Sequence, residues 1–159
     1  MSLSQHASDD CRKVIRAAMD EAVGVSPDAV LSDAYTDTEH LLLAILKFQT
    51  KALTSLLTAE EIRTLRTQTE QRINQLPKLF CPSRPPYSNQ LRAAFEHSLA
   101  ESIRLKCETV EIEHLLLGLL RLGVGNAFQL LTEFGISSEQ VEALLLTRQD
   151  GEPLRDSPG

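Results

Sequence analysis

The octapeptide EHLLLAIL at residues 39–46 occurs a second time, as EHLLLGLL, at residues 113–120. The spacing between the copies, from Glu39 to Glu113, holds for every position, and six of the eight positions are identical. The other two positions exchange one small residue for another and one aliphatic residue for another. So long a spacing predicts a duplicated subdomain rather than a short solenoid unit.

Each copy predicts a buried central helix. Residues 41–46 and 115–120 would be apolar on every face of a helix, and such a helix is normally wrapped by others. The first copy begins at the glutamate of Thr36-x-x-Glu39, which fits a capping box and predicts a helix over 36–48. The second helix is expected over 111–122, where Gly-Val-Gly breaks the pattern.

The helix before each octapeptide is repeated as well. Apolar residues at helical spacing predict an amphipathic helix over 8–23, and the same spacing recurs in a helix that starts at Ser88, which aligns with Ser8. The interval from Ser8 to Ser88 is longer than the interval from Glu39 to Glu113. The loop after the first helix is therefore longer in the first half, and insertions are tolerated best in surface loops.

Two further helices complete each half, and capping residues at their starts predict where they begin. They are expected over 52–57, 58–76, 126–134 and 137–146, with Asn126 as the cap of the third. The chain is therefore predicted to be all-α, with eight helices in two four-helix repeats related by a pseudo-twofold axis.

Four of the seven prolines lie within residues 77–86 and predict a stiff linker between the halves. Residues 148–159 are polar and contain two prolines, which favours a disordered tail or a linker. The expected organisation is an N-terminal arm at 1–7, the first repeat at 8–76, the linker at 77–86, the second repeat at 87–147 and the tail at 148–159.

The composition limits the classes of function. A net charge of −6 disfavours a nucleic-acid-binding protein, which normally carries a basic stripe. The three cysteines, with no CxxC, indicate free thiols in a reducing compartment. No apolar run approaches the roughly 18 residues of a membrane span, and residues 1–10 lack the apolar segment of a secretory signal. We therefore expect a cytoplasmic monomer that binds neither nucleic acid nor membrane.

No residue pattern points to catalysis, to a metal or to a cofactor. The chain has no nucleophile elbow, Walker loop or Gly-rich phosphate cradle. His40 and His114 lack an i+4 metal-binding partner, so packed, hydrogen-bonded histidines at helix starts are expected instead. A small hydrolase is therefore the least favoured function, because no nucleophile and base are paired.

These residues resemble the Clp N-terminal domain, the double-repeat domain at the front of Clp/Hsp100 unfoldase ATPases, and within it the ClpC-like branch. The resemblance rests on the two Glu-His-Leu-Leu-Leu-x-x-Leu copies, on Tyr87-Ser88 before a helix, and on Gly135-Ile136 after one. It covers roughly residues 6–147. Ala7 replaces the aromatic residue expected before Ser8, so the second half is the more typical copy.

The resemblance implies an all-α, non-catalytic domain that recruits substrate proteins and adaptors to a Clp ATPase ring. In some ClpC-type members each repeat binds a phosphorylated arginine. There the Glu of the Glu-His pair takes the guanidinium, while a hydroxyl and amides at a helix start take the phosphate. Carried over to this chain, that pattern implicates Glu39, Glu113, Ser8, Ser88 and Tyr87 in ligand binding.

Two alternatives remain open for the acids. Glu39 and Glu113 can bind a guanidinium bidentately, or they can simply stabilise the first turn of a helix against its dipole. Both are expected at exposed helix ends. We expect the Glu113 copy to be the better site, with Tyr87 and Ser88 nearby, because the first half departs further from the family.

At the level of function, the alternative is a structural or self-associating helical protein with no role in substrate recruitment, since Leu-rich helices can leave apolar surface for a partner. The sequence also leaves open whether the chain is a stand-alone accessory protein or the front domain of a longer Clp ATPase.

Overall fold

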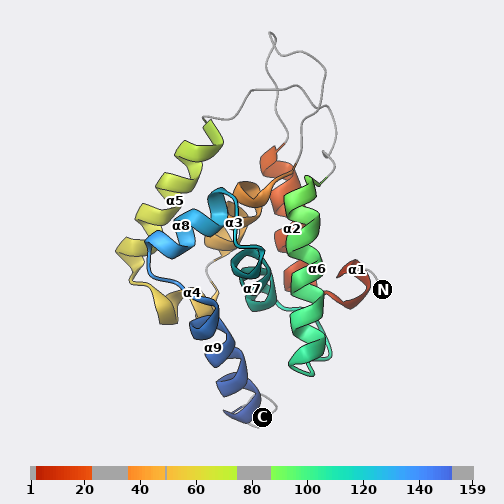
Figure 1. The fold of residues 1–159 in the computed structure, drawn as a ribbon. Coiled ribbons are helices and arrows are strands. Elements are labelled where there is room, and N and C mark those ends of the chain that lie inside the picture. Colours follow the sequence, from red (N-terminus) through yellow and green to blue (C-terminus); the bar gives the residue numbers. More distant parts are fainter. Residues whose placement is uncertain (1–2, 23–35, 49, 75–86, 152–159) are drawn as a thin grey trace.

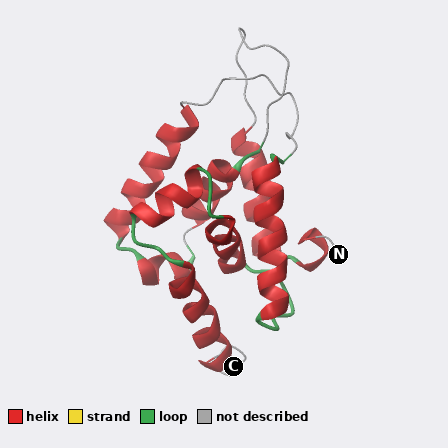
Figure 2. Ribbon diagram, in the orientation of Figure 1, coloured by secondary structure: helices red, strands yellow, loops and turns green. Residues whose placement is uncertain are grey.

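The computed structural model describes residues 3–22, 36–48, 50–74 and 87–151, which form nine helices and no strand (Figures 1 and 2). The loop expected after the first helix, the proline-rich linker at 77–86 and residues 152–159 of the predicted tail lie outside the described residues. Within the described part of the chain, the all-α prediction is confirmed.

The eight predicted helices correspond to two sets of four. The first half contributes α2 (Asp9–Ala22), α3 (Thr38–Phe48), α4 (Lys51–Leu56) and α5 (Ala59–Asn74). The second half contributes α6 (Asn89–Arg104), α7 (Ile112–Leu122), α8 (Asn126–Glu133) and α9 (Ser138–Gly151). Two features differ from expectation: a short α1 (Leu3–His6) precedes the first repeat, and α9 continues beyond its expected end near Leu146.

Most of the predicted helix caps are present. The hydroxyls of Ser8 and Ser88 accept the N–H groups of Cys11 (3.2 Å) and Leu91 (3.1 Å). Reciprocal capping boxes open α5 and α9, where Thr58 pairs with Glu61 and Ser137 with Gln140. Each box satisfies two backbone N–H donors that the first turn of a helix leaves unpaired.

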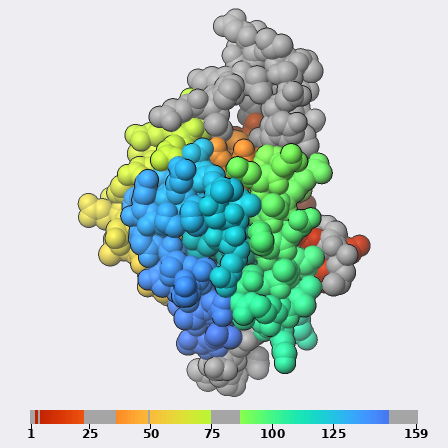
Figure 3. All heavy atoms as spheres, viewed as in Figure 1, coloured from red at the N-terminus to blue at the C-terminus, as the bar shows by residue number. Residues whose placement is uncertain are grey.

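The core is built around α3 and α7, as the two octapeptides predict. Every residue of α3 from Thr38 to Leu46 and of α7 from Ile112 to Leu120 is buried. Helix α2 packs on α3, and α6 packs on α7. The space-filling view shows α8 between α5 and α6 on the outer face of the molecule (Figure 3).

The pseudo-twofold relation extends to an ion pair that the sequence pattern did not reveal. Lys47 on α3 pairs with Glu21 on α2. The alignment of the two halves gives their counterparts as Arg121 on α7 and Glu101 on α6, which lie 3.5 Å apart. In the second half Glu142 of α9 joins the pair, 3.0 Å from Arg121, so α9 is held to the α6–α7 pair.

Helices α6 and α7 cross closely at Gly118. A Cβ at this position would lie 2.1 Å from Ser98 Oγ and 2.3 Å from the Ala94 carbonyl oxygen. The Ser98 hydroxyl itself donates to that carbonyl (2.9 Å). The first half has Ala44 at the matching position.

Among the described residues, no single helix is long and apolar enough to span a membrane. Helices α7 and α8 pass that test only as a pair, and they are bent by 100° relative to each other.

We predict that Gly118→Ala lowers the free energy of unfolding by about 1–3 kcal/mol, because the methyl group overpacks the α6–α7 crossing. Helix propensity alone would favour the alanine by about 1 kcal/mol, so the sign of the change separates the two effects. Denaturant unfolding followed by circular dichroism measures it. An unchanged or higher midpoint would show that the crossing relaxes freely.

Candidate binding sites at the crossed helix starts

The two halves exchange backbone segments: the residues before the first helix of each half pair with the residues before the central helix of the other half. Ala7 pairs in parallel with Val110, and Thr36 pairs in parallel with Tyr87. The Ser8 N–H donates to the Val110 carbonyl (3.0 Å), and the Ser88 N–H donates to the Thr36 carbonyl (2.9 Å). The alignment of the two halves makes these bridges equivalent. The first helix of each half therefore begins beside the central helix of the other half.

This exchange places the predicted site residues in two groups that differ from those expected from the sequence. Ser88 donates from Oγ to Asp37 Oδ1 (2.8 Å), next to Glu39 on α3. Tyr87 pairs with Thr36 at the same place. The expectation that Tyr87 and Ser88 lie near Glu113 is therefore wrong. The reason is that the central helix of each half meets the first helix of the other half.

Ser8 lies instead on the Glu113 side. Its N–H donates to the carbonyl of Val110, two residues before α7, and Cys11 on the first turn of α2 lies near Glu111 and Glu113. Burial, followed by these two carboxylates, raises the pKa of the Cys11 thiol to about 12. We call Ser8, Cys11, Glu111 and Glu113 the Glu113 site. Glu111 was missed in the sequence, although it aligns with Asp37 when the two octapeptides are superimposed.

The matching residues on the other side are Ser88, Asp37, Thr38 and Glu39, which we call the Glu39 site. Glu39 is only 2% exposed, and Glu113 is only 8% exposed. The expectation that both acids lie at exposed helix ends is wrong, because the exchanged segments draw the first turns of α3 and α7 inside the molecule. Asp37 and Glu111, at the outer edges of the two sites, are half-buried.

Glu39 is held by hydrogen bonds from both halves. Its Oε1 accepts the hydroxyl of Thr38 (3.0 Å), and its Oε2 accepts the side-chain amide of Asn126 (3.0 Å). Asn126 was expected to cap α8, but Gly125 occupies the N-cap position and Asn126 is the first residue of the helix. Its side chain is turned toward Glu39, and its Oδ1 accepts a hydrogen bond from Arg72 (2.7 Å).

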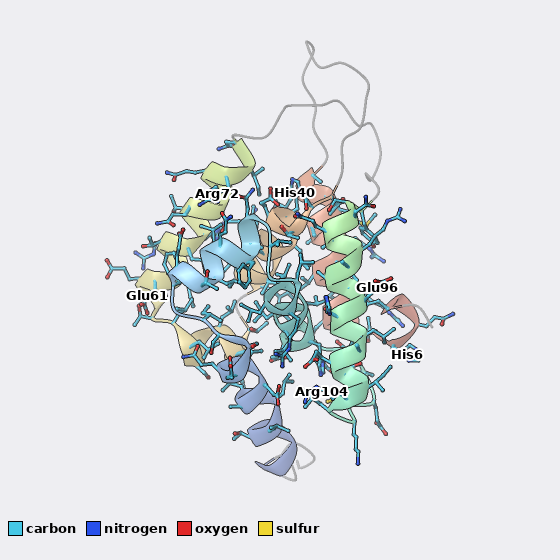
Figure 4. All side chains as sticks on the ribbon, viewed as in Figure 1. His6, His40, Glu61, Arg72, Glu96 and Arg104 are labelled. Carbon is cyan, nitrogen blue, oxygen red and sulfur yellow. The ribbon has the colours of Figure 1, made fainter. Side chains whose placement is uncertain are left out.

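The histidine that follows the glutamate in each octapeptide has a structural role at the start of its helix. His40 Nδ1 accepts the Asp37 N–H (3.0 Å), and His114 Nδ1 accepts the Glu111 N–H (2.9 Å). An accepting Nδ1 carries no proton, so each ring is the neutral tautomer protonated at Nε2. The predicted packed, hydrogen-bonded histidines are confirmed (His40 is labelled in Figure 4).

The predicted capping box of Thr36 with Glu39 is wrong. Asp37 caps α3 instead: its carboxylate accepts the Thr38 N–H (2.7 Å), while His40 serves the Asp37 N–H from the third position of the helix. Glu39 is thereby released from a capping role and turns toward Asn126.

The two sites contain acids, hydroxyls and helix starts, which suit binding rather than bond breaking. The raised pKa keeps the Cys11 thiol protonated, so it is a poor nucleophile. In the described part of the chain, no group of three His, Cys, Asp or Glu residues is placed to hold a metal ion.

We predict that His40 weakens the fold as the pH falls. Burial lowers the pKa of His40 below its ordinary value of 6.5, so below that pH the unfolded chain binds more protons than the folded chain. His40→Gln keeps an acceptor for the Asp37 N–H but does not titrate. Between roughly pH 7.5 and roughly pH 5.5, the wild type should lose more free energy of unfolding than His40→Gln. Parallel pH profiles in denaturant titrations would contradict this assignment.

Comparison with known proteins agrees with the duplicated architecture. The family model described as the Clp repeat (R) N-terminal domain matches residues 6–134. A Mycobacterium tuberculosis protein described as uncharacterized is 32% identical over 139 residues, which cover 86% of this chain and 50% of that protein. A probable ATP-dependent Clp protease ATP-binding subunit of Chlamydia pneumoniae is 28% identical over 137 residues, which cover 85% of this chain and 16% of that protein. The chain thus spans about half the length of its mycobacterial relatives.

Solved structures share the fold at low sequence identity. The N-terminal domain of the ClpD chaperone from Arabidopsis thaliana superposes with a TM-score of 0.65 at 21% identity, covering 95% of this chain and 98% of that one. The N-terminal domain of the ClpV1 ATPase from E. coli gives a TM-score of 0.68 at 19% identity, covering 89% and 85%. With the family model matching most of the sequence, the chain belongs to the Clp repeat N-terminal domain family.

Proposed function

We propose that this chain is a non-catalytic protein-binding module of the Clp chaperone and protease system, with residues 8–76 and 87–147 as its two repeats. Domains of this family typically mediate the binding of substrates or adaptors for Clp ATPases. Its partners would therefore be a Clp ATPase ring, adaptor proteins or substrate proteins. Membership of the ClpC-like branch is part of the same proposal.

The ligand proposed for the Glu113 site is the side chain of a phosphorylated arginine. The single observation that supports it is the exchange that brings the start of α2 beside Glu111 and Glu113. Two carboxylates favour a guanidinium, which can bind a carboxylate through two parallel hydrogen bonds. The start of a helix favours an anion, because its N–H groups and its dipole point outward. A phosphoarginine side chain carries both groups.

The charges around the Glu113 site indicate that its carboxylates contribute more to ligand binding than the helix start does. The first turn of α2 carries Asp9 and Asp10, which are exposed and would repel a phosphate. Arg12, 3.9 Å from Asp9, offsets part of this repulsion. Of the two site acids, half-buried Glu111 is the more accessible and would meet the ligand first, whereas Glu113 lies deeper and would bind it in a less polar environment.

We predict that Glu113→Gln weakens phosphoarginine binding at least tenfold, since it removes one charge-assisted hydrogen-bond acceptor worth about 1.5–3 kcal/mol. Isothermal titration calorimetry with free phosphoarginine measures this change. Glu60→Gln is the matched control, because Glu60 is also a first-turn acid but is exposed on α5. Equal affinity of Glu113→Gln and the wild type would refute the site.

A matched pair of variants tests the contribution of the α2 helix start to phosphoarginine binding. Ser8→Ala should weaken phosphoarginine binding more than Ser137→Ala does. Both serines cap helices, so each variant loses about 1 kcal/mol of stability, but only Ser8 belongs to the Glu113 site. Equal effects on phosphoarginine affinity would show that the hydroxyl of Ser8 acts only as a cap.

Recruitment is tested with the Clp ATPase of the same organism. The purified chain should co-elute with the ATPase or its adaptor and should remain a monomer by light scattering when alone. A tight homo-oligomer that buries the helix starts and ignores the ATPase would favour the self-associating alternative instead.

A further inference from the structure

We infer that Asn126 closes the Glu39 site, so that this duplicated domain has a single ligand-binding site, at Glu113. The inference rests on the proposed function and specifies how many ligand molecules each chain binds. Four observations support it: the hydrogen bonds of Glu39, the position of Arg72, the backbone at Gly125, and the bond between Ser88 and Asp37.

Both oxygens of the Glu39 carboxylate already have donors. The Thr38 hydroxyl donates to one oxygen and the Asn126 amide donates to the other, each at 3.0 Å. Glu39 as a whole is 2% exposed. An incoming guanidinium would have to displace the Asn126 amide, and it would then bury that amide without a partner or force it into solvent.

The Asn126 amide also links Glu39 to an arginine of the same chain. Arg72 of α5 donates from Nη1 to Asn126 Oδ1 (2.7 Å) and to Gln129 Oε1 (3.3 Å), and its Nη2 lies 4.0 Å from Glu133. A cation at one end of an amide strengthens the donor at its other end. Figure 4 shows Arg72 on α5 beside α8, at the same end of the bundle as His40 at the start of α3. The chain thus supplies an internal counter-charge to Glu39 through Asn126.

The backbone before α8 lies against the starts of α3 and α6. Gly125 has a φ of 96°, and a Cβ there would lie 2.8 Å from Gln90 Oε1 and 3.4 Å from Thr38 Oγ1. The turn between α7 and α8 therefore lies against the first turns of α6 and α3. Helix α8 packs against α3, α5 and α7 (Figure 1). This packing covers the approach to Glu39.

The part of the Glu39 site that would receive a phosphate is occupied too. Ser88 uses its hydroxyl hydrogen in the bond to Asp37 (2.8 Å), and its oxygen accepts the Leu91 N–H. A phosphate would have to replace Asp37 as the acceptor of this hydroxyl, which is a smaller rearrangement than displacing the Asn126 amide from the buried Glu39 carboxylate.

The Glu113 site differs at the corresponding positions. Glu111, the counterpart of Asp37, accepts the hydroxyl of Thr109 (2.6 Å) rather than that of the helix-start serine. Helix α4, the counterpart of α8, begins with Lys51, which is exposed, where α8 begins with Asn126. Its main packing partners are α5 and α9, whereas α8 packs against α3, the central helix of the opposite half.

Calorimetric titration of the complete chain with free phosphoarginine tests the inference, with arginine as the ligand that lacks phosphate. We expect one bound equivalent in the wild type and, in Glu113→Gln, no equivalent that binds with the wild-type affinity. Asn126→Ala should bind two equivalents, and Asn126→Ala combined with Glu113→Gln should bind one. Gln129→Ala is the matched control, because it removes the other amide contact of Arg72 but does not touch Glu39.

Two equivalents in the wild type, or one equivalent of wild-type affinity retained in Glu113→Gln, would overturn the inference while leaving the proposed ligand in place. If Asn126→Ala does not fold, Asn126→Ser removes the same amide. The Glu113→Gln titration tests whether the single site is at Glu113 and needs neither Asn126 variant. A folded Asn126 variant that still binds a single equivalent would also overturn it. Absence of phosphoarginine binding by every variant would instead refute the proposed ligand, and the inference with it.

Discussion

The structure depends on the exchanged backbone pairing of Ala7 with Val110 and of Thr36 with Tyr87. A four-helix half of this size has a limited core, and its central helix is apolar on every face. The exchange brings the start of the first helix of each half to the start of the central helix of the other. It also carries the polar first turns of those helices inside the molecule, where their charges need partners.

The two copies meet that requirement in different ways. In both, a histidine at the third helical position accepts the N–H of the capping residue, which satisfies a donor that the helix leaves open. The acids that precede these histidines differ. Glu39 is enclosed by Thr38 and Asn126, so its charge now contributes to holding α8 on α3. Glu113 lies with Glu111 near the Cys11 thiol, which gathers two carboxylates at that helix start. The proposed function therefore assigns one of the two copies to a ligand and the other to internal packing.

The sequence predicted most of the local structure, because that structure is encoded by neighbouring residues. The apolar octapeptides identified α3 and α7, and the serines at positions 8 and 88 identified the starts of α2 and α6. Even the capping boxes of α5 and α9 follow from residues three positions apart. The predicted box of Thr36 with Glu39 failed because Asp37 and His40 cap the helix between them, while a distant residue binds Glu39.

What the sequence did not predict depends on contacts between the halves. Asn126 lies 87 positions from Glu39, and no periodicity relates the two. Aligning the repeats suggested that each site forms within one half, whereas the exchange pairs Ser88 with Asp37 and Ser8 with the start of α7. Glu111 could have been found, since both copies carry an acid two positions before the repeated glutamate.

The most direct test of a site assembled from both halves is a two-dimensional amide NMR spectrum recorded during titration with phosphoarginine. If the start of α2 and the start of α7 form one site, the amides of residues 8–12 and 111–114 should shift together, at the same ligand concentration, while those of residues 88–91 stay in place. Joint shifts of residues 88–91 and 111–114, with residues 8–12 unaffected, would contradict it and would return each site to a single half.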